Sequence, residues 1–535
     1  MTLRPSVAQL QQKHVVLELE SIDRLYLNGY IPQLTTVQGM AGFIRHHLGH
    51  RFASTKSVEA LTRDFVQRIQ EMIQEQQIPL VRFSKGVRKD DVMKERLRQF
   101  KAEEGVVFVG VAQEKCAVPR TVRKTFANGA NVPWLVMSTA MVNVYYFYCK
   151  DRDFGPFFIK FCSYFPYGIK LCLNGHEYLK QQLAQRGVAF EALDNGLLGC
   201  ADLALAQKIC ANLNAEKIDR MFRKWLRRLP HPYSTKTRRA GYRYQLSIWQ
   251  AEFSLTQVWD KPAHGREFFE QVIRENIDLG RPENVQLIFR KKMHKSTVRR
   301  GTCRTRIITE GVEPSLHFYY RKTHLKQYHK EGRALRTETT INDTYDFQVG
   351  RKLHNLDALR PIGFGANRRL LKVQTLRHDP QVGANHFARL QQPLEVAGQH
   401  IPALRFGDPR VQSLLAVLIL FVLQPRGFRH KELRPLLAQH RGLDPERLTP
   451  NQISYDLRRL RGHGLIERLP KSHRYQLTDQ GLKVAYLYQH TLQRVIRPAL
   501  SKILDPNLPP SSPLQRAFQN LHHHLDSFFQ EKIAA

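Results

Sequence analysis

The chain has 535 residues, and its 83 Lys and Arg against 47 Asp and Glu give a formal net charge of +36. The length predicts two to four domains, and a hydrophobic content of 42% excludes a disordered tail. Positive charge of this size repels itself unless a polyanion neutralises it. This favours DNA, possibly RNA, as the partner and disfavours a membrane surface.

The cysteines and the longest apolar run indicate a cytoplasmic protein. The seven cysteines are an odd number and include no C-x-x-C pair, so we expect reduced thiols rather than a disulfide framework or a zinc ribbon. The apolar run from Leu414 to Leu423 is too short to span a bilayer. Residues 1–14 lack the apolar centre of a signal peptide.

In chain order, the first 100 residues are predicted to be mainly helical, with helical periodicity from Val58 that ends at Pro79. A β-branched run predicts a strand at 105–115, and two apolar strands flank the turn DRDFG at 151–155. Helices at 201–229 and 265–276 precede strands at 285–290, 302–311, 314–320 and 334–342. The expected domains are 1–100, 101–400, 405–492 and a helical tail at 493–535.

The stretch from Tyr319 to Asn342 has period-two patterning on both sides of Gly332, which predicts two strands joined by a turn. Its candidate nucleic-acid contacts are Lys326, Tyr328, Lys330 and Arg336. The run from 290 to 306 holds eight Lys or Arg and is either a solvated loop or a loop that grips phosphates. We favour the second interpretation, with Arg299 and Arg300 as contacts, because the neighbouring strands are also basic and aromatic.

Glu338 admits two interpretations. It is either a buried carboxylate paired with Arg336 or Lys326, or a ligand of Mg²⁺. In the second case Glu114 and Asp151 or Asp153 are the candidate partners in a catalytic metal site, because each follows an apolar strand. Taken singly, the two aspartates are typical turn residues. No cofactor is predicted with certainty, and Mg²⁺ is expected if the protein is an enzyme.

Within the same stretch, the pattern K-x-Y-x-K…L-R-x-E (326–338) is similar to one in the rolling-circle replication initiators of plasmids and filamentous phages. The resemblance implies a sheet whose basic and acidic residues hold DNA and a metal ion. The H-x-H metal pair with a catalytic tyrosine that accompanies the pattern in those proteins is not evident. Most of the remaining chain, including LNGHEYLK and RKWLRRLPHPY, resembles a family of bacterial proteins that implies no particular activity.

The clearest module lies at 405–492. An apolar helix and a short second helix precede a third, for which Thr449 is the expected N-cap and Pro450 the first residue. Gly462 and Gly464 end this helix, and a strand, a basic turn, a strand and a helix follow. This is the element order of a winged helix, and the segment resembles MarR-type winged helix-turn-helix domains.

That resemblance implies that the third helix enters the major groove of DNA and that the basic turn lies near phosphates. The candidate base contacts are Asn451, Gln452, Ser454, Tyr455, Arg458, Arg459 and Arg461, and the candidate phosphate contacts are Lys471, His473 and Arg474. The alternative is a winged helix that contacts protein.

The predicted fold class is therefore α+β and multidomain, with a basic mixed α/β body followed by a C-terminal winged helix-turn-helix domain. Three functions stay open. The first is a DNA-binding protein of a mobile element or plasmid whose body grips DNA or RNA. The second is a metal-dependent nuclease, transposase-like protein or replication initiator. The third is a transcriptional regulator.

Overall fold

The computed structural model describes residues 7–84, 86–125, 131–275, 303–308, 315–330, 332–376, 382–396, 398–419, 428–470 and 472–496, with isolated residues beyond 515. The chain forms two compact units. The larger comprises Leu10–Gly280 and His294–Arg368, and the smaller comprises Met1–Gln9, Arg281–Met293 and Arg369–Ala535. The predicted boundaries near residues 100 and 400 do not coincide with this division. Among the described residues, no helix is long and apolar enough to cross a membrane.

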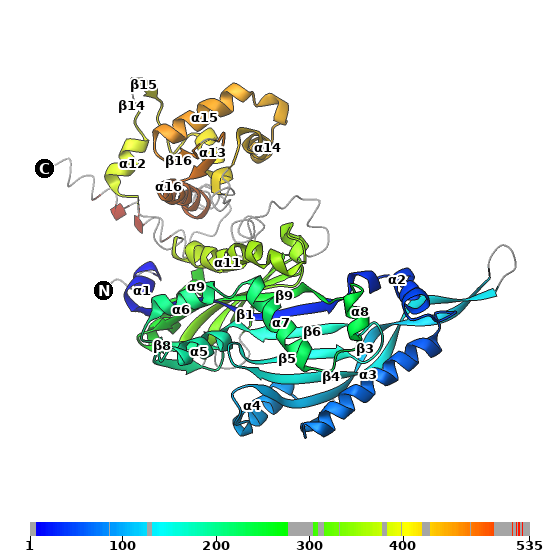
Figure 1. The fold of residues 1–535 in the computed structure, drawn as a ribbon. Coiled ribbons are helices and arrows are strands. Elements are labelled where there is room, and N and C mark those ends of the chain that lie inside the picture. Colours follow the sequence, from blue (N-terminus) through cyan, green and yellow to red (C-terminus); the bar gives the residue numbers. More distant parts are fainter. Residues whose placement is uncertain are drawn as a thin grey trace. The chain divides into compact units, whose positions relative to one another are not determined.

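The larger unit is built on a mixed sheet of 11 strands in the order β10-β11-β12-β13-β9-β1-β6-β5-β4-β3-β2 (Figure 1). Neighbouring strands are antiparallel except β2 and β3, which are parallel. The strands are β1 (Val15–Tyr30), β2 (Leu80–Arg82), β3 (Gly105–Thr125), β4 (Asn131–Asp151), β5 (Gly155–Cys162), β6 (Ile169–Asn174), β9 (Gln245–Trp259), β10 (Cys303–Ile308), β11 (Ser315–Tyr320), β12 (Thr323–Lys330) and β13 (Ala334–Ile341). A separate hairpin pairs β7 (Phe190–Leu193) with β8 (Gly196–Cys200).

Strand β1 lies in the interior of the sheet, between β9 and β6. This differs from the mainly helical region predicted for residues 1–100. The sequence VVLELESIDRLYLNGY alternates buried and less buried residues, with an irregularity between Ile22 and Leu25. Because of this irregularity, the buried Leu17 and Leu19 lie on one face of the sheet and the buried Leu25 and Leu27 on the other. Polar residues alternate with these leucines, so they gave the segment a polar appearance.

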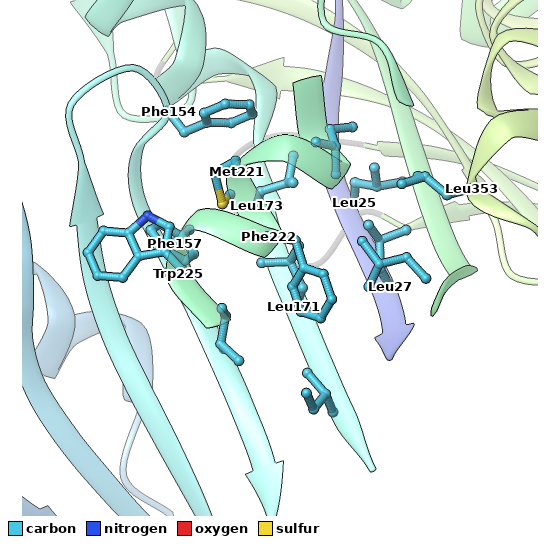
Figure 2. Close-up of a cluster of buried hydrophobic side chains, with 14 of the residues drawn as sticks. Leu25, Leu27, Phe154, Phe157, Leu171, Leu173, Met221, Phe222, Trp225 and Leu353 are labelled. Atoms are coloured by element: carbon cyan, nitrogen blue, oxygen red, sulfur yellow. The ribbon is translucent and has the colours of Figure 1, made fainter. Parts of the chain in front are cut away.

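Helices cover the apolar face of the sheet. They include α3 (Thr55–Glu75), α5 (Gly175–Gln185), α6 (Leu203–Ala211), α7 (Ala215–Arg228), α9 (Pro262–Glu275) and α11 (Leu356–Leu376), with shorter helices α1 (Val7–His14), α2 (Val37–Gly42) and α8 (Thr235–Arg239). In α7, Ile218, Met221, Phe222 and Trp225 recur at helical spacing and are buried. Figure 2 shows three of them against Leu25, Leu27, Leu171 and Leu173 of β1 and β6.

The hairpin of β3 and β4 forms a long arm. Its strands pair from Gly105 to Thr125, whereas β5 pairs only with Val144 to Asp151 of β4. The outer part of the arm therefore has no β5 neighbour, and Figure 1 shows it projecting from the sheet. Helix α4 (Lys89–Gln99) packs near the base of the arm, where Phe108, Tyr146 and Tyr148 form a second apolar cluster.

The smaller unit contains the C-terminal module in the predicted order of elements. The module consists of α13 (Pro409–Ile419), α14 (His430–His440), α15 (Pro450–Gly462), β16 (Ile466–Arg468), β17 (Tyr475–Leu477) and α16 (Asp479–His490). It follows α12 (Ala384–Leu390), β14 (Leu394–Val396) and β15 (Gln399–Ile401), which were not predicted. The predicted start of α15 is confirmed, because the Thr449 side chain accepts a hydrogen bond from the Gln452 backbone amide and the Gln452 side chain accepts one from the Thr449 backbone amide. Gly464 follows the helix with φ of 70°.

Candidate nucleic-acid interface and carboxylate cluster

One face of the large sheet is only partly covered. In β5, β6, β11 and β12, fully buried residues alternate strictly with half-buried ones. Directly opposed residues point to the same side of a sheet. Because His317 lies opposite Lys326, and Lys326 opposite Glu338, these half-buried side chains share one face, which we call the half-open face. Arg24 and Tyr26 of β1 continue it.

Aromatic and imidazole rings lie nearly parallel on this face. The rings of Tyr319 and His324 are 4.5 Å apart and inclined by 6°, and those of His317 and His324 are 5.1 Å apart and inclined by 9°. Burial, then the neighbouring His317 and Lys326, lower the pKa of His324 to about 4, so this ring is neutral at pH 7. Further along the face, Lys170 Nζ lies 3.6 Å from the centre of the Trp249 ring.

Beside these rings, a buried ion pair holds β1 to β13. The Arg336 side chain is fully buried, and its Nη2 lies 2.5 Å from Asp23 Oδ2. Nη2 also lies 2.7 Å from Nε2 of His176, a residue in the first turn of α5. A guanidinium only donates, so His176 Nε2 is an acceptor and the imidazole is neutral. Burial, then Arg336, lower the pKa of His176 to about 3, which agrees with a neutral ring.

Three carboxylates meet at this ion pair. Asp23, Glu252 and Glu338 each offer an oxygen, and these atoms lie within 4.8 Å of one another. Burial opposes the ionisation of Asp23, but Arg336 and His176 hold its pKa below the usual range. Glu338 lies 3.2 Å from Lys326 Nζ and accepts a hydrogen bond of 3.2 Å from the Tyr328 hydroxyl.

Glu252 is the third carboxylate of this cluster, and its pKa is raised rather than lowered. Its described hydrogen bond comes from the Gln250 amide at 2.8 Å, and Gln250 carries no charge. Burial, then Glu338 and Asp23, raise the pKa of Glu252 to about 7. Burial, then Asp23, also raises the pKa of Glu338. The cluster thus holds a proton near neutrality that a cation would displace.

The structure does not bring the other predicted acids to Glu338. Asp151 lies on β4, which is the fifth strand from β13 in the sheet, or about 24 Å away at the usual strand spacing. Glu114 lies on β3, which is the sixth strand from β13, or about 29 Å away. The Asp151 Oδ1 atom accepts the amides of Asp153 and Phe154, and Oδ2 accepts from Trp225 and Lys224. Its role is that of a turn residue, and Asp153 lies exposed in the same turn.

Glu114 is an ion-pair partner on the arm. It contacts Lys160 and accepts a hydrogen bond from Tyr146, with Lys89 3.6 Å away. Burial acts against its charge, but Lys160 and Tyr146 lower its pKa overall. With these partners, the negative charge of Glu114 is already compensated.

Two arginines predicted to contact nucleic acid are buried instead. Arg336 is held by Asp23, as described above, and the turn between β7 and β8 covers it, because its guanidinium donates to the Asn195 carbonyl. Arg459 of α15 is 5% exposed and donates to the Ala403 carbonyl. Its position in the helix places it beside Ile453, Leu457 and Leu460 in the core, so it is not available to a base edge.

The other predicted contacts lie as follows. Lys326, Tyr328 and Lys330 are half-buried on the half-open face. In the smaller unit, Asn451, Gln452, Ser454, Arg458, Arg461 and His473 are exposed, Tyr455 is half-buried, and Arg474 is half-buried 3.6 Å from Glu432. Arg299, Arg300 and Lys471 lie outside the described residues.

Sequence reasoning missed Asp23, His176 and Glu252. Asp23 and Glu252 are acids inside the strand patterns SIDRLYL and QAEFSLTQV, where a carboxylate is costly to bury without a partner. The cost of burying an unpaired carboxylate was the signal that could have identified these residues. Their meeting point depends on the strand order, which the sequence does not display.

No family model matches the chain, and no curated protein matches it. One solved structure is similar, described as a rolling circle replication initiator protein from Geobacillus stearothermophilus. The match has 9% sequence identity and a TM-score of 0.19, and covers 72% of this chain and 89% of the other. A TM-score this low does not demonstrate a common fold.

Proposed function

We propose that the protein binds a nucleic-acid strand on the half-open face and cleaves it at the carboxylate cluster with a divalent cation. The observation that carries this proposal is the juxtaposition on one sheet face of stacked rings, lysines and three converging carboxylates. The K-x-Y-x-K…L-R-x-E pattern supplies Lys326, Tyr328 and Glu338 of this arrangement. Replication initiation is the process that best suits the combination.

The rings favour an unpaired strand. Bases stack on exposed aromatic faces only when they are not already stacked in a duplex, and lysines between the rings track the phosphates. Tyr319 of β11 and His324 of β12 provide the stack, and Lys326 and Lys330 follow His324 along β12 on the same face. Single-stranded DNA is therefore the preferred ligand, with RNA as the alternative that the assay must separate.

The arm extends this surface. Arg120 and Lys124 lie opposite Val136 and Val132, on the same side of the ribbon as Trp134, whose ring is 4.8 Å from Lys124 Nζ. The sequence from Lys115 to Lys150 contains no Asp or Glu. An arm with cations, an exposed tryptophan and no acids suits a polyanion.

The carboxylate cluster fits a hard divalent cation. Oxygen donors from Asp23, Glu252 and Glu338 are the ligands that Mg²⁺ prefers. Arg336 pairs with Asp23 and Lys326 pairs with Glu338, while Arg24 and Lys326 also act on Glu252. A cation would therefore bind in place of the proton that Glu252 holds near neutrality. When bound, the cation would stabilise the charge that develops on a phosphate during cleavage.

Tyr328 is the candidate nucleophile. Its hydroxyl lies 3.2 Å from Glu338 Oε2, which is placed to accept the phenolic proton. Attack of the phenolate oxygen on phosphorus would form a phosphotyrosine bond and release one end of the strand as a free hydroxyl. Burial, and then the charge of Glu338, raise the pKa of Tyr328. The phenol therefore stays neutral until a cation offsets the negative charge of the nearby carboxylates.

Cleavage is tested with a 5′-labelled single-stranded DNA library, matched RNA and supercoiled plasmid, each with Mg²⁺ or Mn²⁺. We expect wild type to leave a covalent protein–DNA adduct in denaturing gels, and Tyr328→Phe and Glu252→Gln to leave none. Tyr26→Phe, on the same face, is the matched control and retains the adduct. Equal adduct from Tyr328→Phe would refute the nucleophile, and cleavage that ignores the cation would refute the metal.

Binding is tested separately by fluorescence anisotropy in EDTA, where no cleavage occurs. Tyr319→Ala should weaken binding of single-stranded DNA by about 1–3 kcal/mol, the usual contribution of one stacked base. Tyr345→Ala is the control, because Tyr345 is 61% exposed but lies outside the sheet. Equal losses in both variants would place the strand elsewhere.

A second function is favoured by the smaller unit. Helix α15 presents Asn451, Gln452, Ser454, Arg458 and Arg461 to solvent, and the β16–β17 hairpin follows it. Exposed amides and guanidinium groups on one helix suit the base edges of the major groove. We propose that this unit is a winged helix that recognises a duplex site, while the larger unit acts on a strand.

A further inference from the structure

A second cluster of potential metal ligands lies at the start of β1, and it is independent of the proposed function. The ladder between β1 and β9 ends with Val15 opposite Trp259, and the Asp260 amide donates to the His14 carbonyl at 2.9 Å. His14 and Asp260 are thus fixed face to face although 246 positions separate them. His264, one turn into α9, lies over the same aspartate.

The three side chains converge on one point. His14 Nδ1 lies 2.9 Å from Asp260 Oδ2, and His264 Nδ1 lies 2.7 Å from Asp260 Oδ1. The two imidazole rings are 3.7 Å apart. One donor atom from each residue lies within 4.8 Å of the others, and the side chains are 17%, 35% and 25% exposed in the order His14, Asp260, His264. A metal ion can therefore enter from solvent.

We propose that His14, Asp260 and His264 form a binding site for a divalent transition-metal ion, with Zn²⁺ as the favoured physiological occupant. Two imidazole nitrogens and one carboxylate suit Zn²⁺, Co²⁺ or Ni²⁺, whereas Mg²⁺ prefers oxygen donors alone. Three protein ligands leave a fourth position for water or another donor. The chemistry of this site thus differs from that of the carboxylate cluster.

The donor spacing is compatible with coordination after a small adjustment. Tetrahedral Zn²⁺ with bonds of about 2.0–2.1 Å places neighbouring donors about 3.3 Å apart. The Nδ1–oxygen separations of 2.7 and 2.9 Å are those of hydrogen bonds, so the rings must move outward by about half an ångström. Partly exposed side chains allow this movement. The ion would then join the start of β1 to the start of α9.

The competing possibility is a pair of histidines that share protons with one aspartate. The hydrogen bonds from His264 and His14 hold the pKa of Asp260 well below its usual range, which a metal-free arrangement also explains. The two possibilities differ in whether the cluster binds Co²⁺. Bound Co²⁺ is detected by its visible absorption, which reports nitrogen and oxygen ligands in a tetrahedral field.

The experiment titrates the full chain with Co²⁺, followed by displacement with Zn²⁺, in wild type and in His14→Gln, His264→Gln and His50→Gln. The chain has 23 histidines, so the measured quantity is the difference in bound equivalents. We expect both His14→Gln and His264→Gln to lose one equivalent and its visible bands. His50→Gln, at an exposed histidine outside the cluster, should lose none.

Identical titrations in all four proteins would overturn the site. If one variant proves unstable, Asp260→Asn provides an independent test, because the amide still hydrogen-bonds the rings but binds metal weakly. Retention of the equivalent in Asp260→Asn together with its loss in His264→Gln would exclude Asp260 as a ligand and refute the three-residue site.

Discussion

Replacing Arg336 with methionine removes the cation of the buried pair while roughly conserving the length of the side chain. Asp23, 2% exposed, would then keep its negative charge inside the sheet without a guanidinium partner. Breaking a buried ion pair in this way costs about 3–5 kcal/mol. We therefore expect Arg336→Met to lower the free energy of unfolding of the larger unit by about that amount.

Arg333, three positions earlier, supplies the matched control. It pairs with Glu191 at 3.1 Å, but the two side chains are 55% and 59% exposed. Exposed pairs contribute about 0–1 kcal/mol, so Arg333→Met should be nearly neutral. The assay is urea denaturation followed by tryptophan fluorescence. All four tryptophans, at 134, 225, 249 and 259, belong to the larger unit, so the signal reports that unit alone.

Two further measurements test the cause. The pKa of Asp23 is lowered in the folded state, so its stabilisation is present above its unfolded pKa of about 3.9 and is lost as pH falls further. The difference between wild type and Arg336→Met should therefore shrink below pH 4. Adding Asp23→Asn to the variant should recover part of the loss. Equal effects of Arg336→Met and Arg333→Met would refute the reasoning.

Three other changes follow from the described contacts. Glu252→Gln should stabilise the larger unit by at most about 3 kcal/mol at pH 8, but not at pH 5. The pKa of Glu252 is raised from 4.5 to about 7, so above pH 7 the folded state must hold an unfavourable ionised carboxylate, which the amide removes. Arg458→Ala should weaken duplex binding in a gel shift by about 1–3 kcal/mol without a change in melting, whereas Arg459→Ala should lower the melting temperature. Gly363→Ala should unfold at lower urea concentration, because its Cβ would lie 2.1 Å from the Phe253 ring.

Each of these has a contradicting outcome. A pH-independent effect of Glu252→Gln would show that the carboxylate is not strained by its neighbours. Equal loss of duplex binding in both arginine variants, with unchanged melting, would place Arg459 at the interface. Gly42→Ala, where an added Cβ meets nothing within 4 Å, is the control for the glycine change and should be neutral or slightly stabilising.

Local chemistry made part of the fold predictable. The side chains of Thr449 and Pro450 fix the start of α15 by capping it and by restricting its first residue. In the turn at Asp151, the Asp151 carboxylate accepts hydrogen bonds from two backbone amides that lie within three residues of it. The strands on either side of Gly332 were predicted because alternation is visible over a few positions. In each case the residues that decide the structure are close together in the sequence.

The carboxylate cluster was not predictable by the same route. Arg336 and Asp23 are 313 positions apart, and they meet only because β1 lies next to β9 and β9 next to β13. The predicted grouping of Glu338 with Glu114 and Asp151 treated the ends of apolar strands as neighbours. The strand order places four or more strands between them.

Arg336 shows how burial reverses an interpretation based on charge. Its neighbours Tyr328 and Lys326 are half-buried on β12, which made the whole stretch look like one basic surface. The residues of β13 are all buried, because the β7–β8 hairpin contacts Arg336 on one face and Asn367 of α11 contacts Thr339 on the other. A cation in such a strand must find a buried anion, and the sequence alone does not tell which of 47 acids it finds.

The interior position of β1 also constrains how the chain is synthesised and folds. Its partners on one side are residues 169–174 and on the other 245–259, so each edge of the first strand remains unpaired long after it leaves the ribosome. Val15 pairs with Trp259, and at 5–20 residues per second that delay is on the order of 10–50 s. Contacts so distant in sequence also slow folding. A nascent chain that stops before β9 exposes an apolar strand edge, so chains truncated there should require chaperones or aggregate.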